Sequence, residues 1–284
     1  MTIYKLLINT NHFYLEPNKV TIRTALIEYF NISVGGRVIA YQDDQEWEGI
    51  VEYQSDWPIA SRYYIDLNKS VQRDVPPDIN LGRKEGLDSG LPVGYGFSKR
   101  ELLKAMTDDN MNQYTIQQYL NFSMEALKNK YRTYIRETRK EILKISIDTN
   151  SNYLGPDKPT IFLNHIRYFE ITTGDRIIGY QDDQEWEGMI ESQSHLPEWY
   201  QFYIDLNTCI ETIIAPEVYK ARDDGGSIGM ALGEKDTKLF VAEAMFQDGL
   251  AIEKIEQYTD IPLLELQTIQ EGYIEKINHQ MKYE

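Results

Sequence analysis

The chain has little of what secreted, metal-binding and hydrolytic proteins commonly need. It contains one cysteine, Cys209, and only four histidines among 284 residues. A single cysteine cannot form an intrachain disulfide, so no disulfide framework is expected. No His-Glu-x-x-His or Gly-x-Ser-x-Gly pattern is present, which leaves no motif of a zinc protease or a serine hydrolase. We therefore expect a protein that is not an enzyme and that has no cofactor and no metal.

Long apolar runs are also missing. No segment approaches the roughly 18 apolar residues that a membrane-spanning helix needs. The first residues lack the basic stretch and apolar core of a secretory signal. These absences predict a cytoplasmic protein without membrane contact. Apolar residues nevertheless make up 42% of the chain, and this share favours a globular fold over disorder.

Positive charge is scarce in one half only. Residues 1–139 contain 18 acidic and 17 basic side chains, whereas residues 140–284 contain 27 acidic and 12 basic ones. The formal net charge of −16 therefore belongs almost wholly to the second half. Such an asymmetry indicates that the halves have different partners or that they face each other.

An internal repeat organises the sequence. When the chain is shifted by 139 residues, Tyr41–Gly49 aligns with Tyr180–Gly188 without a mismatch, and Tyr64–Asn68 aligns with Tyr203–Asn207. Solenoid units run to about 20–50 residues, so each of these longer copies is expected to be a domain. We interpret the chain as a tandem duplication, whose first and second repeats are residues 1–139 and 140–284.

Composition divides both repeats in the same way. Alternating apolar and polar residues predict strands in a β segment, at residues 1–70 and 143–209. Clustered glycine and proline then predict a long loop, at residues 72–97 and 211–236. Apolar residues at helical spacing predict closing helices, at residues 98–139 and 237–280.

Two stretches carry a resemblance to known modules. The pattern Val-Gly-Gly-Arg-Val-Ile-Ala-Tyr, Trp-Glu-Gly-Ile-Val and Tyr-Tyr-Ile-Asp-Leu, within residues 34–67, resembles the small SH3-like barrels of the Tudor and KOW type. The pattern Ala-x-x-Met, Asp-Gly, Ile-Glu-Lys-Ile and Thr-Asp-Ile-Pro, within residues 242–262, resembles a helix-turn-helix. Together they imply an α+β fold, in which each copy is a small β-barrel-like sheet followed by a trihelical segment.

The identical segment is the candidate site. Its acids do not follow the ligand spacing of an EF-hand calcium loop, and carboxylates side by side on a hairpin point into water, where they keep ordinary pKa values. Two interpretations remain, a structural Trp47 and Gly49 with solvated acids, or an acidic-aromatic docking surface. A turn alone would not need every side chain kept, so the predicted partner-binding residues are Tyr41, Asp43, Asp44, Glu46, Trp47, Glu48, Tyr180, Asp182, Asp183, Glu185, Trp186 and Glu187.

The function indicated is that of an acidic, non-enzymatic protein that binds a macromolecule and regulates or inhibits it. Immunity proteins and anti-defence inhibitors are acidic when their protein targets present basic, nucleic-acid-binding surfaces, and complementary charge speeds association. The alternative is a nucleic-acid-binding transcriptional regulator that uses the basic closing helix of the first repeat, because lysine and arginine neutralise phosphates. That interpretation rests on Lys128, Lys130, Arg132, Arg136 and Arg139.

Overall fold

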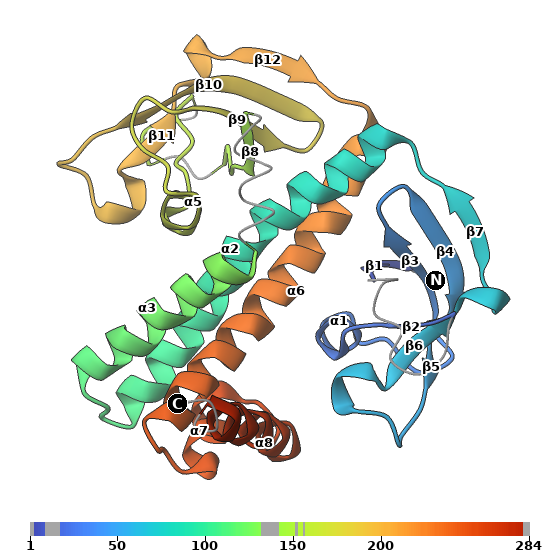
Figure 1. Ribbon diagram of the computed structural model, residues 1–284. Helices are drawn as coiled ribbons and strands as arrows, with labels where there is room; N and C mark the ends of the chain where they lie inside the picture. Colours follow the sequence, from blue (N-terminus) through green and yellow to red (C-terminus); the bar gives the residue numbers. More distant parts are fainter. Residues whose placement is uncertain (1–2, 9–17, 132–141, 151–152, 156, 281–284) are drawn as a thin grey trace.

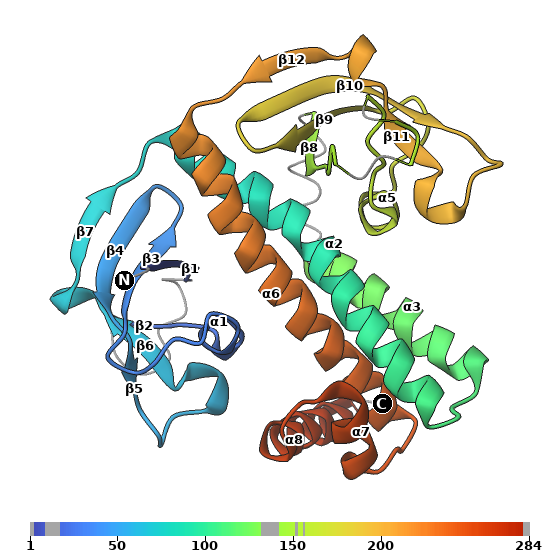
Figure 2. The ribbon, with the colours of Figure 1, turned by 180° about the vertical axis from the view of Figure 1, so that it is seen from behind.

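The computed structural model describes residues 3–8, 18–131, 142–150, 153–155 and 157–280. It has the mixed α+β fold expected from the sequence. Two β-units, one from each half of the chain, lie on opposite sides of a central pair of long helices, as both ribbon views show (Figures 1 and 2). No described helix combines the length and the apolar character that crossing a bilayer requires.

The first β-unit comprises the described residues up to 74. A four-stranded sheet has the order β1-β3-β4-β7, with β1 parallel to β3, and a three-stranded sheet has the order β2-β6-β5. The helix α1 (Thr24–Tyr29) buries Leu26 and Ile27. The strands are β1 (Tyr4–Leu7), β2 (Lys19–Thr21), β3 (Arg37–Gln42), β4 (Gln45–Ile50), β5 (Glu52–Tyr53), β6 (Tyr63–Asp66) and β7 (Val71–Asp74), with short 3-10 helices at Ile59–Ser61 and Leu67–Lys69.

The second β-unit comprises the described residues 142–213. Its sheet has the order β11-β10-β9-β8, and β12 pairs with β10 as well. The hairpin strands β3 and β9 occupy equivalent positions 139 residues apart, and each precedes a loop of two aspartates. The elements are β8 (Leu143–Ser146), α5 (Leu163–Phe169), β9 (Arg176–Gln181), β10 (Gln184–Ser192), β11 (Phe202–Ile204) and β12 (Ile210–Ile213), with 3-10 helices at Glu198–Tyr200 and Leu206–Thr208.

The small barrel expected from the sequence is not formed. Within the described residues, none of the sheets closes into a barrel. The outer edge of β4 is paired with β7, and that of β10 with β12, two strands that the predicted loops had concealed. Each of these edge strands leads directly into a long helix, so the chain leaves the sheet where barrel closure would require it to turn back.

The long helices α2 (Pro77–Asp108) and α6 (Pro216–Gln247) lie side by side and run in the same direction. Each begins with a proline, whose fixed φ suits the first helical turn. Glycines spaced by four residues line the contact, and a Cβ on any of them would overlap the backbone of the other helix. They are Gly86, Gly90 and Gly94 in α2 and Gly225, Gly229 and Gly233 in α6.

The predicted Gly- and Pro-rich loops at residues 72–97 and 211–236 are therefore wrong over almost their whole length, because each begins in an edge strand and continues as a long helix. Their glycines lie inside helices. Glycine costs about 1 kcal/mol relative to alanine in an isolated helix, which is why local propensity indicated a loop. Here the absence of a side chain lets two backbones approach closely, and the dispersion contacts of that approach offset the local cost.

Each long helix packs on the β-unit of the other half. Helix α2 contacts β8 and α5, whereas α6 contacts β1 and α1. One apolar core runs through both β-units and the helix pair. The two halves consequently share a core.

A second apolar core lies at the far end of the helix pair. It joins the ends of α2 and α6 to α3 (Gln113–Lys130), α7 (Ile252–Thr259) and α8 (Leu263–Gln280). Helices thus close the described part of both halves, as the sequence indicated for residues 98–139 and 237–280. Residues 132–139 of the first prediction lie outside the described part.

Candidate functional site

The identical segments turn most of their side chains inward. Tyr41, Glu46 and Trp47 are buried in the first half, and Tyr180, Glu185 and Trp186 are buried in the second. Asp43 and Asp182 adopt a positive φ at the hairpin tips. The exposed members of the predicted docking surface are Asp43, Asp44, Asp182 and Asp183, and Glu48 and Glu187 are half-buried.

A buried arginine explains why the inward side chains are the same in both halves. The guanidinium of Arg83 stacks 4.4 Å from the ring centre of Tyr41 and donates to Glu46. Arg222 repeats this arrangement 4.9 Å from Tyr180 and donates to Glu185. Cation–π contact and charge-assisted hydrogen bonds are strongest away from water. The segment therefore fastens each hairpin to its own long helix.

A residue of the opposite half completes each cluster. Glu85 of α2 accepts a hydrogen bond from Nε of Arg222 at 2.6 Å and pairs with Lys144 at 3.2 Å. In the equivalent place, Asp224 of α6 lies 3.6 Å from Lys5. Each cluster therefore also ties a long helix to the other half's β-unit.

These clusters shift the pKa of their central glutamate. Burial alone would raise the pKa of Glu185, but hydrogen bonds and charge from Lys144 and Arg222 lower it below its usual value. Glu46 behaves in the same way, with Arg83 as its main partner. Both carboxyls are therefore charged at neutral pH and serve as structural counter-ions.

The basic residues of the predicted nucleic-acid-binding helix are partly engaged within the molecule. Lys128 pairs with Glu170 at 3.3 Å, and Lys130 pairs with Asp236 at 2.7 Å. Arg132, Arg136 and Arg139 lie outside the described residues. The described part of this helix thus offers two lysines whose charge is already compensated.

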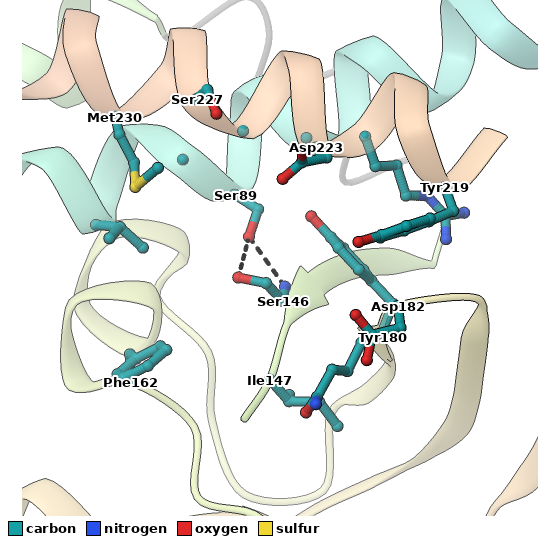
Figure 3. A pocket seen from close by; sticks show the side chains of 16 residues that line it. Ser89, Ser146, Ile147, Phe162, Tyr180, Asp182, Tyr219, Asp223, Ser227 and Met230 are labelled. Atoms are coloured by element: carbon teal, nitrogen blue, oxygen red, sulfur yellow. Dashed lines mark hydrogen bonds between the residues drawn. The ribbon is translucent and has the colours of Figure 1, made fainter. Parts of the chain in front are cut away.

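A cavity between the second β-unit and both long helices is the strongest candidate site. Its volume is about 300 Å³. Side chains from α2, α6, the start of α5, β8 and the β9–β10 hairpin line it (Figure 3). The lining includes Ser89, Ser146, Phe162, Tyr180, Asp182, Tyr219, Asp223 and Met230. We refer to it below as the interhelix cavity.

Two hydroxyls form the polar floor of the interhelix cavity. Oγ of Ser89 lies 2.9 Å from Oγ of Ser146 and accepts the backbone N–H of Ser146 at 2.9 Å (Figure 3). Ser89 is buried in the middle of α2, and behind it lies His165, which is completely buried. This floor joins a helix of the first half to the first strand of the second.

The serine–histidine pair is not arranged for nucleophilic catalysis. Nε2 of His165 lies 2.9 Å from the carbonyl oxygen of Ser89 and 3.2 Å from its Oγ. A protonated Nε2 that donates to the carbonyl cannot take the hydroxyl proton, which a general base must do. Nδ1 has no hydrogen-bond partner among the described residues, so no third group orients the ring. Burial lowers the pKa of His165 to about 4, and the ring is neutral at pH 7.

Acidic and phenolic groups surround the mouth of the cavity. The hydroxyls of Tyr180 and Tyr219 point into the same space as the carboxylate of Asp223 (Figure 3). Burial raises the pKa of Tyr180 to about 12. Burial and the nearby carboxylates of Asp223 and Asp182 raise the pKa of Tyr219. Both phenols are consequently neutral hydrogen-bonding groups at physiological pH.

Sequence reasoning missed this cavity because its residues are scattered over both halves and belong to no motif. One signal could have pointed to it, namely the aligned positions at which the repeats differ in polarity. Ser89 is aligned with Ile228, His165 with Leu26, and Asp223 with Lys84. At these positions the two halves carry side chains of different polarity.

The described residues contain no group of three or more histidine, cysteine, aspartate or glutamate side chains that is placed to hold a metal ion. The chain matches none of the protein-family models, curated proteins or solved structures with which it was compared.

Proposed function

We propose that this chain is a non-enzymatic, acidic protein that docks on a basic surface of a protein partner and regulates or inhibits it, in the manner of an immunity or anti-defence inhibitor. A cytoplasmic location and an origin of the two halves by duplication belong to the same proposal. It is supported by exposed carboxylates that gather at one end of the second half, around the β9–β10 hairpin and the start of α6.

This acidic face consists of exposed residues on three neighbouring segments. The backbone N–H of Ile214, just after β12, donates to the carbonyl of Asp183 at 2.9 Å, so β12 and the hairpin tip are adjacent. Among the described residues, no lysine or arginine pairs with any carboxylate of this face. The acidic face is Asp182, Asp183, Glu211, Glu217 and Asp223.

The corresponding region of the first half has a different charge. Glu211 replaces a glutamine, Gln72, and Asp223 replaces a lysine, Lys84, at aligned positions. Thr212 stands where the first half has Arg73, which there neutralises Glu46 at 2.8 Å. These replacements make this face more acidic than its counterpart in the first half, and such a patch attracts a basic partner over several ångströms.

Affinity capture from the native cell, with mass spectrometry, tests this function with a matched pair of variants. Asp182→Asn, Asp183→Asn and Asp223→Asn together neutralise the acidic face, and Asp43→Asn with Asp44→Asn neutralise the first hairpin. Asparagine tolerates the positive φ at the hairpin tips, so both variants should fold. The buried Trp47 and Trp186 are unsuitable, because their replacement would disturb the core.

The expected result is a partner with a basic surface that wild type and the Asp43/Asp44 variant retain and the acidic-face variant loses. Its association rate should fall as salt rises, because exposed charges are screened. Equal capture by both variants would exclude the acidic face as the docking surface. Binding of duplex DNA at low salt, lost linearly with the logarithm of salt concentration, would favour the nucleic-acid-binding alternative instead.

A further inference from the structure

The interhelix cavity has uncompensated negative charge at its mouth. Asp182 and Asp223 line it and form no ion pair with any described lysine or arginine. Deeper in, Arg222 and Lys144 are already balanced by Glu85 and Glu185. The charge that a molecule entering the cavity would meet is therefore negative.

The first half supplies its own cation at the equivalent place. Lys84 occupies the position of Asp223, about two turns into the long helix beside the hairpin. The second half has a carboxylate there and leaves open space beside it. A mobile cation would restore at this mouth the charge that Lys84 provides in the other copy.

The walls of the interhelix cavity suit an organic cation better than a hydrated metal ion. Tyr180 and Tyr219 form one side, and Phe162 and Met230 lie across from them (Figure 3). Aromatic faces attract ammonium and guanidinium groups, and thioethers pack well against irregular apolar bodies. A volume of about 300 Å³ is at the lower end of small-molecule sites.

We propose that the interhelix cavity binds a small organic cation, an amidinium, guanidinium or primary ammonium group on a compact apolar body. The charged head lies between Asp182 and Asp223, and the body lies against Tyr180, Tyr219 and Met230. The proposal shares Asp182 and Asp223 with the acidic face, but it does not require docking of a protein partner, because it rests on the cavity and its lining. The cation is either a free amine or a basic side chain of a protein.

Isothermal titration of the full chain with benzamidine tests the site, with benzamide as the uncharged control of the same shape. Benzamidine is expected to bind saturably and benzamide at least tenfold more weakly, because only the amidinium can pair with the carboxylates. Binding that is equal for the two compounds, or absent for benzamidine at millimolar concentration, overturns the proposal.

Three variants locate the binding. Asp223→Lys installs the residue of the first half, and Gly226→Leu installs the counterpart of Leu87 in the cavity wall. Both are expected to abolish benzamidine binding. Asp43→Asn, which removes a carboxylate from the first hairpin, should leave benzamidine binding unchanged. Circular dichroism and melting curves check that each variant is folded, and full binding by a folded Asp223→Lys variant contradicts the assignment.

Competition separates the two sources of the cation. A glycine-flanked peptide with a single arginine is added to the benzamidine complex. Displacement shows that the mouth admits a side chain from a protein partner. Undiminished benzamidine binding, at peptide concentrations where arginine amide alone competes, shows that the site takes free cations only. Both results support the site and identify what fills it.

Discussion

The two sides of the α2–α6 pair share the same hairpin and helix contacts, but different side chains lie between the helices and each β-unit. Toward the first β-unit, the space is packed with the buried side chains Leu26, Leu87 and Ile228. The aligned positions on the second side hold His165, Gly226 and Ser89, and there the interhelix cavity opens. One side is thus an ordinary apolar core, and the other has exchanged packing for polar groups and space.

The difference shows which parts of the design both halves need. The arginine, tyrosine and glutamate at the centre of each charge cluster and the helix-contact glycines are the same on both sides, because they fix the hairpins and bring the helices together. The side chains that lie between the helices and the β-units differ in size and polarity at the three aligned positions named above. A cavity costs stability, since its lining atoms lose packing partners. Its position, where the aligned residues of the first side are filled by Leu26, Leu87 and Ile228, is therefore a reason to look for function there.

The largest effect on stability is expected at two adjacent glycines of α6. Gly225 aligns with a glycine of the first half, and Gly226 does not. A Cβ on Gly225 would overlap the carbonyl oxygen of Arg83, whereas a Cβ on Gly226 would lie 3.7 Å from the oxygen of Gly86. Gly225→Ala should lower the free energy of unfolding by about 3 kcal/mol, because backbone must move. Gly226→Ala should raise it by about 0.5–1 kcal/mol through helix propensity. Urea denaturation measures both, and equal effects would contradict this helix contact.

The dependence of the free energy of unfolding on pH tests the role of the buried His165. His165 is buried and neutral, with its pKa lowered to about 4. As pH falls, His165 takes up a proton near pH 6.5 in the unfolded chain but only near pH 4 in the folded chain. Its contribution to the free energy of unfolding is therefore fully present above pH 6.5 and is lost as pH falls toward 4. At pH 5 the loss is about 2 kcal/mol. His165→Leu, which installs the counterpart of Leu26, should flatten the profile over this range.

Chemical denaturation at pH 7, 6 and 5 checks this prediction. The slope of unfolding free energy against pH is compared, since it does not depend on how well leucine packs. The exposed His195 provides the control, and His195→Gln should leave the slope unchanged. Parallel profiles for wild type and His165→Leu would show that the buried ring is not the source of acid sensitivity.

The smallest effect concerns the two charge clusters. Nε of Arg222 bonds to Glu85 at 2.6 Å, but Nε of Arg83 has no hydrogen-bond partner among the described residues. The aligned acid there is Asp224, which is one methylene shorter and whose pKa is raised by burial. Asp224→Glu should therefore stabilise the chain by about 1 kcal/mol. Glu85→Asp should destabilise it by a similar amount, and thermal unfolding at pH 7 should show opposite shifts in Tm.

Several elements were predictable from local pattern. The strands around Tyr41 and Trp47, the strand beginning at Tyr63 and the helices α7 and α8 follow from alternation and helical spacing. The bounds of the strands were less predictable, since only Asp43 and Asp44 lie between β3 and β4 and the polar Gln45 and Glu46 already belong to β4. Element boundaries depend on pairing across strands, which no local window contains.

The long helices and the cavity could not be predicted in the same way. Gly86, Gly90 and Gly94 indicate a loop when read alone, and they are helical only because α6 packs against them. The burial of Tyr41 and Glu46 likewise depends on Arg83, which lies 37 residues from Glu46. The repeat alignment contained the signal for both features, in the glycines that it retains and in the polar positions that it does not.

Because α2 covers the second β-unit and α6 covers the first, the covalent link between the halves is not their main attachment. A chain cut between residues 131 and 142 would still have to separate one apolar core and two charge clusters before its pieces could diffuse apart. The two halves are therefore held together by contacts between distant parts of the chain, in the way that two separate subunits would be.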